Sequence, residues 1–154
     1  MRARLWPGSA WHLLWSDDAP VVAGTPAPGP VGYFPPPGGV RFGTFTLPPA
    51  TATEDADPDD ATDDGAARAE LDALLPGLRA TLDADPAGFH ASATVDFELV
   101  LSGEVTLELP DGTATRLRAG DTVVQNGARH RWVNTGSGPV VIALVMLGVT
   151  HPPG

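Results

Sequence analysis

The sequence contains no cysteine and no lysine among its 154 residues. Without cysteine there is no disulfide framework, no thiolate nucleophile and no cysteine-ligated zinc site. Without lysine there is no Schiff-base chemistry and no lysine general base. No apolar run is long enough to span a bilayer, and the N-terminal segment lacks the sustained apolar stretch of a signal peptide. We therefore expect a cytoplasmic protein with no membrane partner.

Basic side chains are also scarce, because nine arginines stand against 19 acidic residues and leave a net charge of −10. Such a chain has no basic surface to displace phosphate counterions, so we expect no nucleic-acid partner. Much of the acidity lies in residues 54–64, which contain no core-forming side chain and are expected to form a disordered surface loop. An EF-hand calcium loop is not expected there, because Asp60 and Ala66 replace its required glycine and glutamate.

Proline and glycine are abundant, with 17 and 18 residues, which favours short strands joined by turns over a helical bundle. Strand-like segments separated by turn signals follow Phe89. They span residues 94–102, 104–110, 114–119, 121–125, 130–134 and 139–147. Residues 110–112, Pro-Asp-Gly, predict a hairpin turn. The predicted fold class is all-β, an antiparallel sandwich or barrel.

The length suits a single domain with one core. Its expected parts are an N-terminal arm with the first strands (1–49), an acidic loop with short helices (50–88), the barrel core (89–147) and a tail (148–154). Residues 40–47 alternate like a strand, with a slip or bulge near Gly43. Leucines at helical spacing surround Pro76, which predicts two short helices in place of one. Their apolar stripe should cover a sheet edge or a barrel mouth.

The strand-like segment 140–147 is apolar at every position. One face of it fits a barrel interior, and the other needs a cover from helices or from a second subunit. The apolar segment 11–15 could supply that cover, within the chain or across a dimer. We expect a homodimer.

The stretch 89–105 combines one apolar face with one polar face, because side chains alternate along a strand. The polar face carries His90, Ser92, Asp96 and Glu98. A second polar patch carries His130, Trp132 and Asn134. If the two patches face each other, two imidazoles and one carboxylate converge with open positions, and such a set holds divalent iron and related metals. His12 and His151 are interpreted as ordinary structural histidines.

These patches resemble the two motifs of the cupins, a family of small antiparallel jelly-roll barrels. The first motif, G-x5-H-x-H-x3/4-E-x6-G, corresponds to His90, Ser92, Asp96 and Gly103. The second, G-x5-P-x-G-x2-H-x3-N, corresponds to Gly120, Gln125, Gly127, His130 and Asn134, with one residue fewer after the first glycine. The resemblance covers residues 89–147 and, more thinly, 40–49. It implies a jelly-roll barrel with a short helical insertion before the metal motif.

The resemblance implies a divalent metal ion, Fe, Mn, Ni or Zn, bound by His90, Asp96 and His130. Ser92 replaces the second histidine of the motif and Asp96 replaces its glutamate. Both changes should lower the affinity for a metal. A pocket that binds no metal is therefore an alternative interpretation. Alternatively, Asp96 could hydrogen-bond a histidine without touching the metal.

Candidates for catalytic proton transfer are Asp96 and Glu98. Candidates for substrate contacts are Ser92, Gln125, Trp132 and Asn134. Glu98 could instead be a solvated rim residue, and Trp132 a core residue. Arg129 and Arg131 alternate with His130, so they are expected to point away from the pocket.

Three functions remain open at this point. The first is a metal-dependent cupin that acts on a small organic molecule, with the metal as Lewis acid in a lyase, isomerase or oxygenase type reaction of secondary metabolism. The second is a non-catalytic cupin that binds a small ligand at a degenerate metal site. The third is a structural barrel with a vestigial site. Resemblance of fold does not choose among them.

Overall fold

The computed structural model describes residues 2–3, 8–24, 32–51, 69, 72–82, 85 and 87–150. Its strands are β1 (Arg2–Ala3), β2 (Ala10–Asp17), β3 (Val40–Leu47), β4 (Thr94–Ser102), β5 (Glu104–Glu108), β6 (Ala114–Arg118), β7 (Thr122–Asn126), β8 (Arg131–Val133) and β9 (Val140–Gly148). The helix α3 (Leu78–Leu82) precedes β4. The predicted acidic loop 54–64 and His151 lie outside the described residues. None of the helices described is long and apolar enough to cross a membrane.

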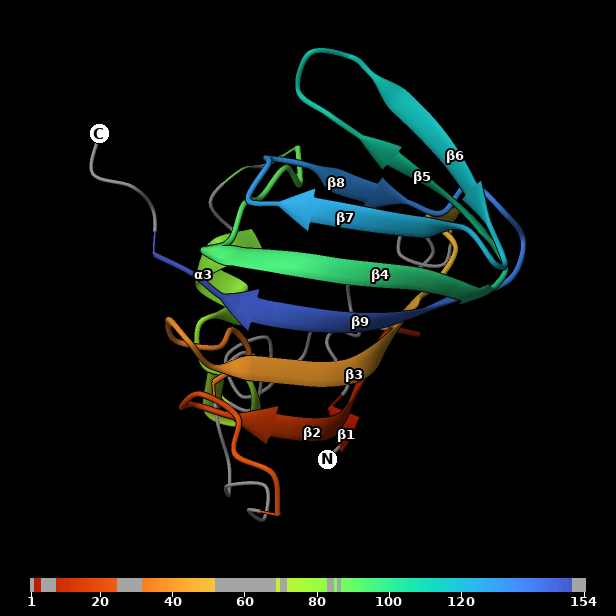
Figure 1. The fold of residues 1–154 in the computed structure, drawn as a ribbon. Coiled ribbons are helices and arrows are strands. Elements are labelled where there is room, and N and C mark those ends of the chain that lie inside the picture. Colours follow the sequence, from red (N-terminus) through yellow and green to blue (C-terminus); the bar gives the residue numbers. More distant parts are fainter. Residues whose placement is uncertain are drawn as a thin grey trace.

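Two antiparallel sheets form the fold (Figure 1). The larger has the strand order β1-β2-β3-β9-β4-β7, and the smaller has the order β6-β5-β8. An isolated bridge between His90, ahead of β4, and His130, ahead of β8, links the two sheets. The predicted all-β antiparallel fold class is therefore confirmed. The predicted hairpin is confirmed as well, because β5 and β6 pair around a turn in which Gly112 has a φ of 88°.

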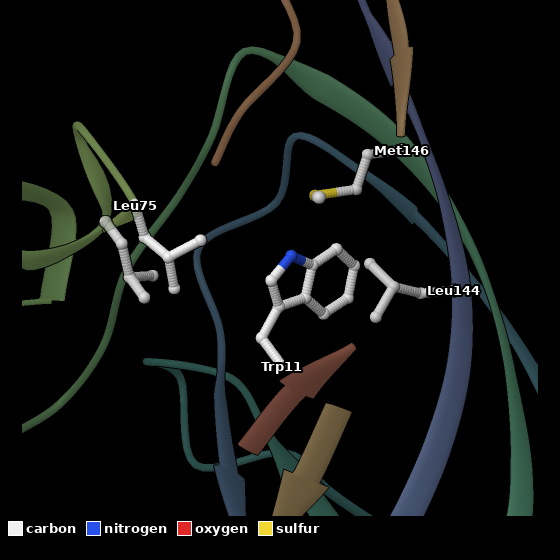
Figure 2. Packing of buried hydrophobic residues seen from close by; sticks show 5 residues of the cluster. Trp11, Leu75, Leu144 and Met146 are labelled. Atoms are coloured by element: carbon white, nitrogen blue, oxygen red, sulfur yellow. The ribbon is translucent and has the colours of Figure 1, made fainter. Parts of the chain in front are cut away.

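The interior holds two apolar clusters. The first packs Trp11, 1% exposed, against Leu75, Leu78, Leu144 and Met146 (Figure 2). The second consists of Val100, Val105, Leu117, Val140 and Ile142. The inward residues of β9 belong to both clusters, so this central strand joins them into one continuous core.

Gly43 makes room for the Trp11 ring. A Cβ atom at Gly43 would lie 2.5 Å from the ring and 2.5 Å from the His12 carbonyl oxygen, so no larger residue fits. The slip predicted near Gly43 is confirmed in the pairing of β2 with β3, where Leu13 faces Gly43 and Trp15 faces Phe42, whereas β3 pairs with β9 without a shift. The shift lies in the facing strand β2, between Leu13 and Trp15. Phe42 breaks the expected apolar alternation because it faces outward, where it is 40% exposed.

The helical segment is divided as Pro76 predicts. Residues 72–74 are helical, and α3 begins at Leu78 after a turn. Leu75 and Leu78 are buried against the core and Leu78 lines the pocket, so the segment covers the barrel mouth as expected.

Arg41 fixes a loop against the larger sheet from a fully buried position. Its guanidinium donates to the carbonyl oxygens of Gly32 (2.9 Å), Asp17 (3.1 Å) and Val40 (2.9 Å). It also pairs with the Asp18 carboxylate. These bonds satisfy a buried charge with backbone acceptors, and they hold the loop that carries Tyr33 and Phe34.

The outer face of the larger sheet is apolar, and none of the described residues of the chain covers it. Its exposed side chains include Phe42, Phe97, Leu99, Val124 and Leu147, which are 37–61% exposed. The segment 11–15 does not cover this face, since it belongs to β2 and adds a strand to the same sheet. Outward positions of β3, β9, β4 and β7 carry no charge, although the chain has a net charge of −10. Large exposed apolar patches of this kind mark association surfaces.

We expect two copies to associate through this face, so Val124→Glu should yield a monomer where the wild type is a dimer at micromolar concentration. Burying the new carboxylate without a partner opposes association. Light scattering coupled to size exclusion measures the mass. Val21→Glu is the matched control, because Val21 is 57% exposed and lies in the segment after β2. A monomeric wild type would contradict the expectation.

Candidate functional site

A pocket of about 210 Å³ lies against the inner face of the larger sheet. Its apolar walls come from the loop after residue 31, from β3, α3, β8 and β9: Tyr33, Phe34, Phe45, Leu47, Leu78, Trp132, Ile142, Leu144 and Met146. Its polar wall consists of His90, Ser92, Asp96, Glu98 and His130. Six of the eight candidate site residues therefore gather in one cavity.

Gln125 and Asn134 do not line the pocket. Asn134 is 2% exposed, and its amide donates to the carbonyl oxygens of Leu47 (3.1 Å) and Gly138 (2.9 Å). Its side-chain oxygen accepts from the N–H of Gly136 (3.0 Å), so Asn134 organises the turn before β9. Gln125 is also buried, paired across the sheet with Asp96.

The two motif histidines are neighbours on adjoining strand ends. Each backbone N–H donates to the carbonyl oxygen of the other residue at 2.9 Å, and the ring centroids lie 4.6 Å apart. The Nδ1 atom of His90 lies 3.2 Å from the Gly88 carbonyl oxygen, and that of His130 lies 2.8 Å from the Ala128 carbonyl oxygen. A carbonyl only accepts, so each Nδ1 carries the hydrogen and each Nε2 keeps its lone pair.

Burial keeps both imidazoles neutral. It lowers the pKa of His90 below its usual value, against a smaller opposing effect of the Gly88 carbonyl. Burial likewise lowers the pKa of His130. The pocket thus holds two uncharged imidazoles that accept through Nε2 at neutral pH.

Asp96 and Glu98 form the second polar group, side by side on the inward face of β4. Asp96 is 7% exposed, and its Oδ1 atom has no hydrogen-bond partner within the described part of the chain. The Oε2 atom of Glu98 is buried and equally unpartnered there. Glu98 is therefore not the solvated rim residue that the sequence left open. Unpaired buried oxygens are costly, so each one is available to a ligand.

Burial raises the pKa of Asp96 to about 6, against an opposing hydrogen bond from Thr94. The pKa of Glu98 rises further, to about 8, through burial and then through the charge of Asp96. Burial and the charges of both carboxylates also raise the pKa of Tyr33, so its hydroxyl stays protonated. At neutral pH the pocket thus combines one carboxylate with one carboxylic acid.

The three metal ligands implied by the motif line one pocket, but they do not form a group that could hold a metal ion. The described residues contain no group of three or more His, Asp or Glu side chains that could hold a metal ion. Asp96 is engaged by Thr94, whose hydroxyl also lies 2.6 Å from the Ser92 hydroxyl. The two imidazoles remain, which is fewer than the three protein ligands of a catalytic zinc site. The residues present do not fit a bound metal.

Arg129 and Arg131 point away from the pocket, as predicted. Arg129 pairs with Asp85. Arg131 pairs with Glu108 (2.7 Å), donates to the Ala87 carbonyl oxygen (2.8 Å) and covers the Phe89 ring at 4.7 Å. Together they tie the segment before His90 to β8.

Tyr33, Phe34 and Leu78 are pocket residues that sequence reasoning missed. Tyr33 and Phe34 lie in a proline-rich loop, where no periodicity indicates which side chains turn inward. The Tyr33 ring packs on Trp11 and Phe34 with centroid distances of 5.2 and 4.9 Å. For Leu78, the helical leucine pattern predicted the covering position but not the contact with the pocket. His12 also departs from expectation, because its Nε2 is buried without a partner among the described residues.

The motifs and the barrel geometry agree with a comparison to known families. Residues 83–147 match the family model described as "Cupin domain". This segment is a cupin domain. It contains the whole polar wall of the pocket, and Tyr33, Phe34 and β3 add walls from outside it.

Relatives of the cupin domain occur in fungi. Oryzines biosynthesis cluster protein J of Aspergillus oryzae is 41% identical over 46 residues, which are 30% of this chain and 26% of that protein. Phomopsin biosynthesis cluster protein D of Diaporthe leptostromiformis is 36% identical over 66 residues, 40% of this chain and 35% of that protein. The matches thus span about a quarter to a third of these relatives. A solved Cupin 2 conserved barrel domain protein of Salinispora arenicola shares 16% identity over 94% of this chain and 79% of its own, with a TM-score of 0.48.

Glu98 should make folding stability fall as pH rises. Its pKa is about 8 in the folded protein against an ordinary 4.5, so the folded state retains a proton that the unfolded chain releases in this interval. The contribution of the protonated Glu98 to folding stability is complete below pH 4.5, the ordinary pKa of a glutamate. It is lost as pH rises through about 8. Each pKa unit corresponds to about 1.4 kcal/mol, so the free energy of unfolding should fall by several kcal/mol.

Urea denaturation across this pH range measures the effect. Glu98→Gln should remove the fall in stability between about pH 6 and 8, because an amide does not titrate, and should leave the smaller dependence of Asp96, whose pKa is about 6, at lower pH. Glu104→Gln, which alters a half-buried carboxylate of β5 outside the pocket, should keep the pH dependence of the wild type. Identical profiles for both variants would show that Glu98 does not carry the dependence.

Proposed function

We propose that this protein binds a small organic molecule in the barrel pocket and catalyses a proton transfer on it, as in an isomerase or lyase type reaction. The observation that carries the proposal is the buried pair Asp96 and Glu98 in the cavity, each with an oxygen that no described residue hydrogen-bonds. Asp96 serves as the base and Glu98 as the acid, because their environments separate their pKa values around neutrality.

The surrounding residues suit such a reaction. The Nε2 atoms of His90 and His130 accept hydrogen bonds from the substrate, and the protonated Tyr33 hydroxyl can donate one. Apolar walls keep water away from the carboxyls and preserve their raised pKa values. The two imidazoles and the Tyr33 hydroxyl thus orient a polar substrate against the carboxyl pair.

The relatives support a role in biosynthesis. Their names place two of them in the oryzine and phomopsin biosynthesis clusters, and their matched segments lie within the cupin domain. A small-molecule substrate of secondary metabolism is the corresponding proposal for this chain.

A divalent metal, which the motif implies, would have two imidazole ligands and no third side chain from the described part of the chain. We therefore expect weak Zn(II) and Ni(II) binding by the wild type. Ser92→His should raise the affinity at least tenfold, because it restores the motif's missing histidine on a side chain that lines the same pocket. Isothermal titration with each metal measures this, with Ser92→Ala as the control. Wild-type affinity equal to that of Ser92→His would contradict the two-ligand site.

The proton transfer can be tested directly. Small carbonyl compounds with an acidic C–H bond are screened for binding by thermal shift, and the bound ones are incubated in D₂O. The wild type should catalyse deuterium incorporation, observed by NMR. Asp96→Asn, which removes the base, should slow it by about 10²- to 10⁴-fold. The matched control, Glu104→Gln, should exchange at the wild-type rate. Binding without any exchange would instead support the non-catalytic ligand-binding function.

A further inference from the structure

We propose that the pocket selects a small organic amine, whose nitrogen binds at Asp96 and Glu98 while its apolar body fills the rest of the cavity. The inference rests on the proposed function, since it concerns the same pocket, and it adds the chemical class of the ligand.

The first argument is the hydrogen-bond demand of the carboxyl pair. Asp96 is 93% buried, being 7% exposed, and its Oδ1 atom has no partner among the described residues. Glu98 adds a second unpartnered oxygen, Oε2, from the same face of the same strand. A ligand that donates to Asp96 Oδ1 and makes a hydrogen bond with the Glu98 carboxyl removes the desolvation cost of both groups. An ammonium group carries three N–H donors on one atom, whereas a hydroxyl carries one.

The second argument is charge. None of the described residues that line the pocket is an arginine, and the chain contains no lysine. The nearest basic side chains of β8 and its approach, Arg129 and Arg131, are paired with Asp85 and Glu108 outside the pocket. The positive charge that complements the Asp96 carboxylate must therefore arrive with the ligand. The net charge of −10 also favours the approach of cations over anions.

The third argument is shape. Apart from its polar wall, the cavity is lined by Phe34, Phe45 and Trp132 together with other apolar side chains. Its volume is about 210 Å³. An apolar protein cavity of roughly 150 Å³ accommodates benzene, so a single ring bearing an aminomethyl group is of suitable size. The aromatic walls also favour a nearby cation through their π faces.

Benzylamine, benzyl alcohol and benzoate are suitable probes, because they share one ring and differ in the charge of the polar group. Isothermal titration at neutral pH should show benzylamine binding at least tenfold more tightly than benzyl alcohol, and benzoate more weakly than either. Asp96→Asn and Glu98→Gln, both close in shape to the native residues, should each reduce the preference for the amine. Glu104→Gln makes the same acid-to-amide change outside the pocket, at a partly exposed residue of β5, and should retain the preference.

The outcomes separate the inference from the function on which it rests. Equal or tighter binding of benzyl alcohol would overturn the amine preference while leaving a ligand-binding pocket. An amine preference unchanged in both pocket variants would overturn the assignment to Asp96 and Glu98. Absence of binding by all three probes would contradict both the inference and the proposed pocket function. If one pocket variant fails to fold, the other variant still tests the assignment to the carboxyl pair. The comparison of the three probes on the wild type still tests the amine preference.

Discussion

The alternation of side chains along β4 is the constraint on which the rest of the structure depends. Successive residues of a strand point to opposite faces, so Asp96 and Glu98 cannot enter the pocket unless Phe97 and Leu99 face outward. The pairing of β4 with β9 and β7 fixes this register on both sides. One strand thereby creates two surfaces of opposite character, a polar wall inside an apolar cavity and an apolar face outside an acidic molecule.

The pocket is completed by parts of the chain that are distant in sequence. Arg41 lies in β3, yet its bonds to backbone carbonyls hold the loop that brings Tyr33 and Phe34 over the carboxyls. On the other side, Arg131 holds the Phe89 segment against β8. These two arginines act from outside the cavity. They build its walls without adding a positive charge to it, so the raised pKa values of Asp96 and Glu98 persist.

The strands, the hairpin and the division of the helical segment at Pro76 were predictable, because each depends on local periodicity or turn chemistry. The shared face of His90, Ser92, Asp96 and Glu98 was predictable for the same reason. The contribution of Tyr33 was not, since its position depends on Arg41 reaching across from another strand. The slip near Gly43 was predictable, but not that the extra residue lies in the facing strand β2, because the pairing partner of 40–47 cannot be read from its own alternation. Motif spacing implied three metal ligands, but it could not reveal that Thr94 engages Asp96.

The bridge between His90 and His130 joins the two sheets entirely through backbone atoms, with a hydrogen bond in each direction. Any residue other than proline can make these bonds, so the bridge between the sheets does not require imidazoles at either position. At positions 90 and 130, the backbone holds the sheets together and the side chains determine the chemistry of the pocket, so the two roles are independent. A chain of this fold can exchange the side chains at both positions, and so change what it recognises, while the junction of its sheets stays intact.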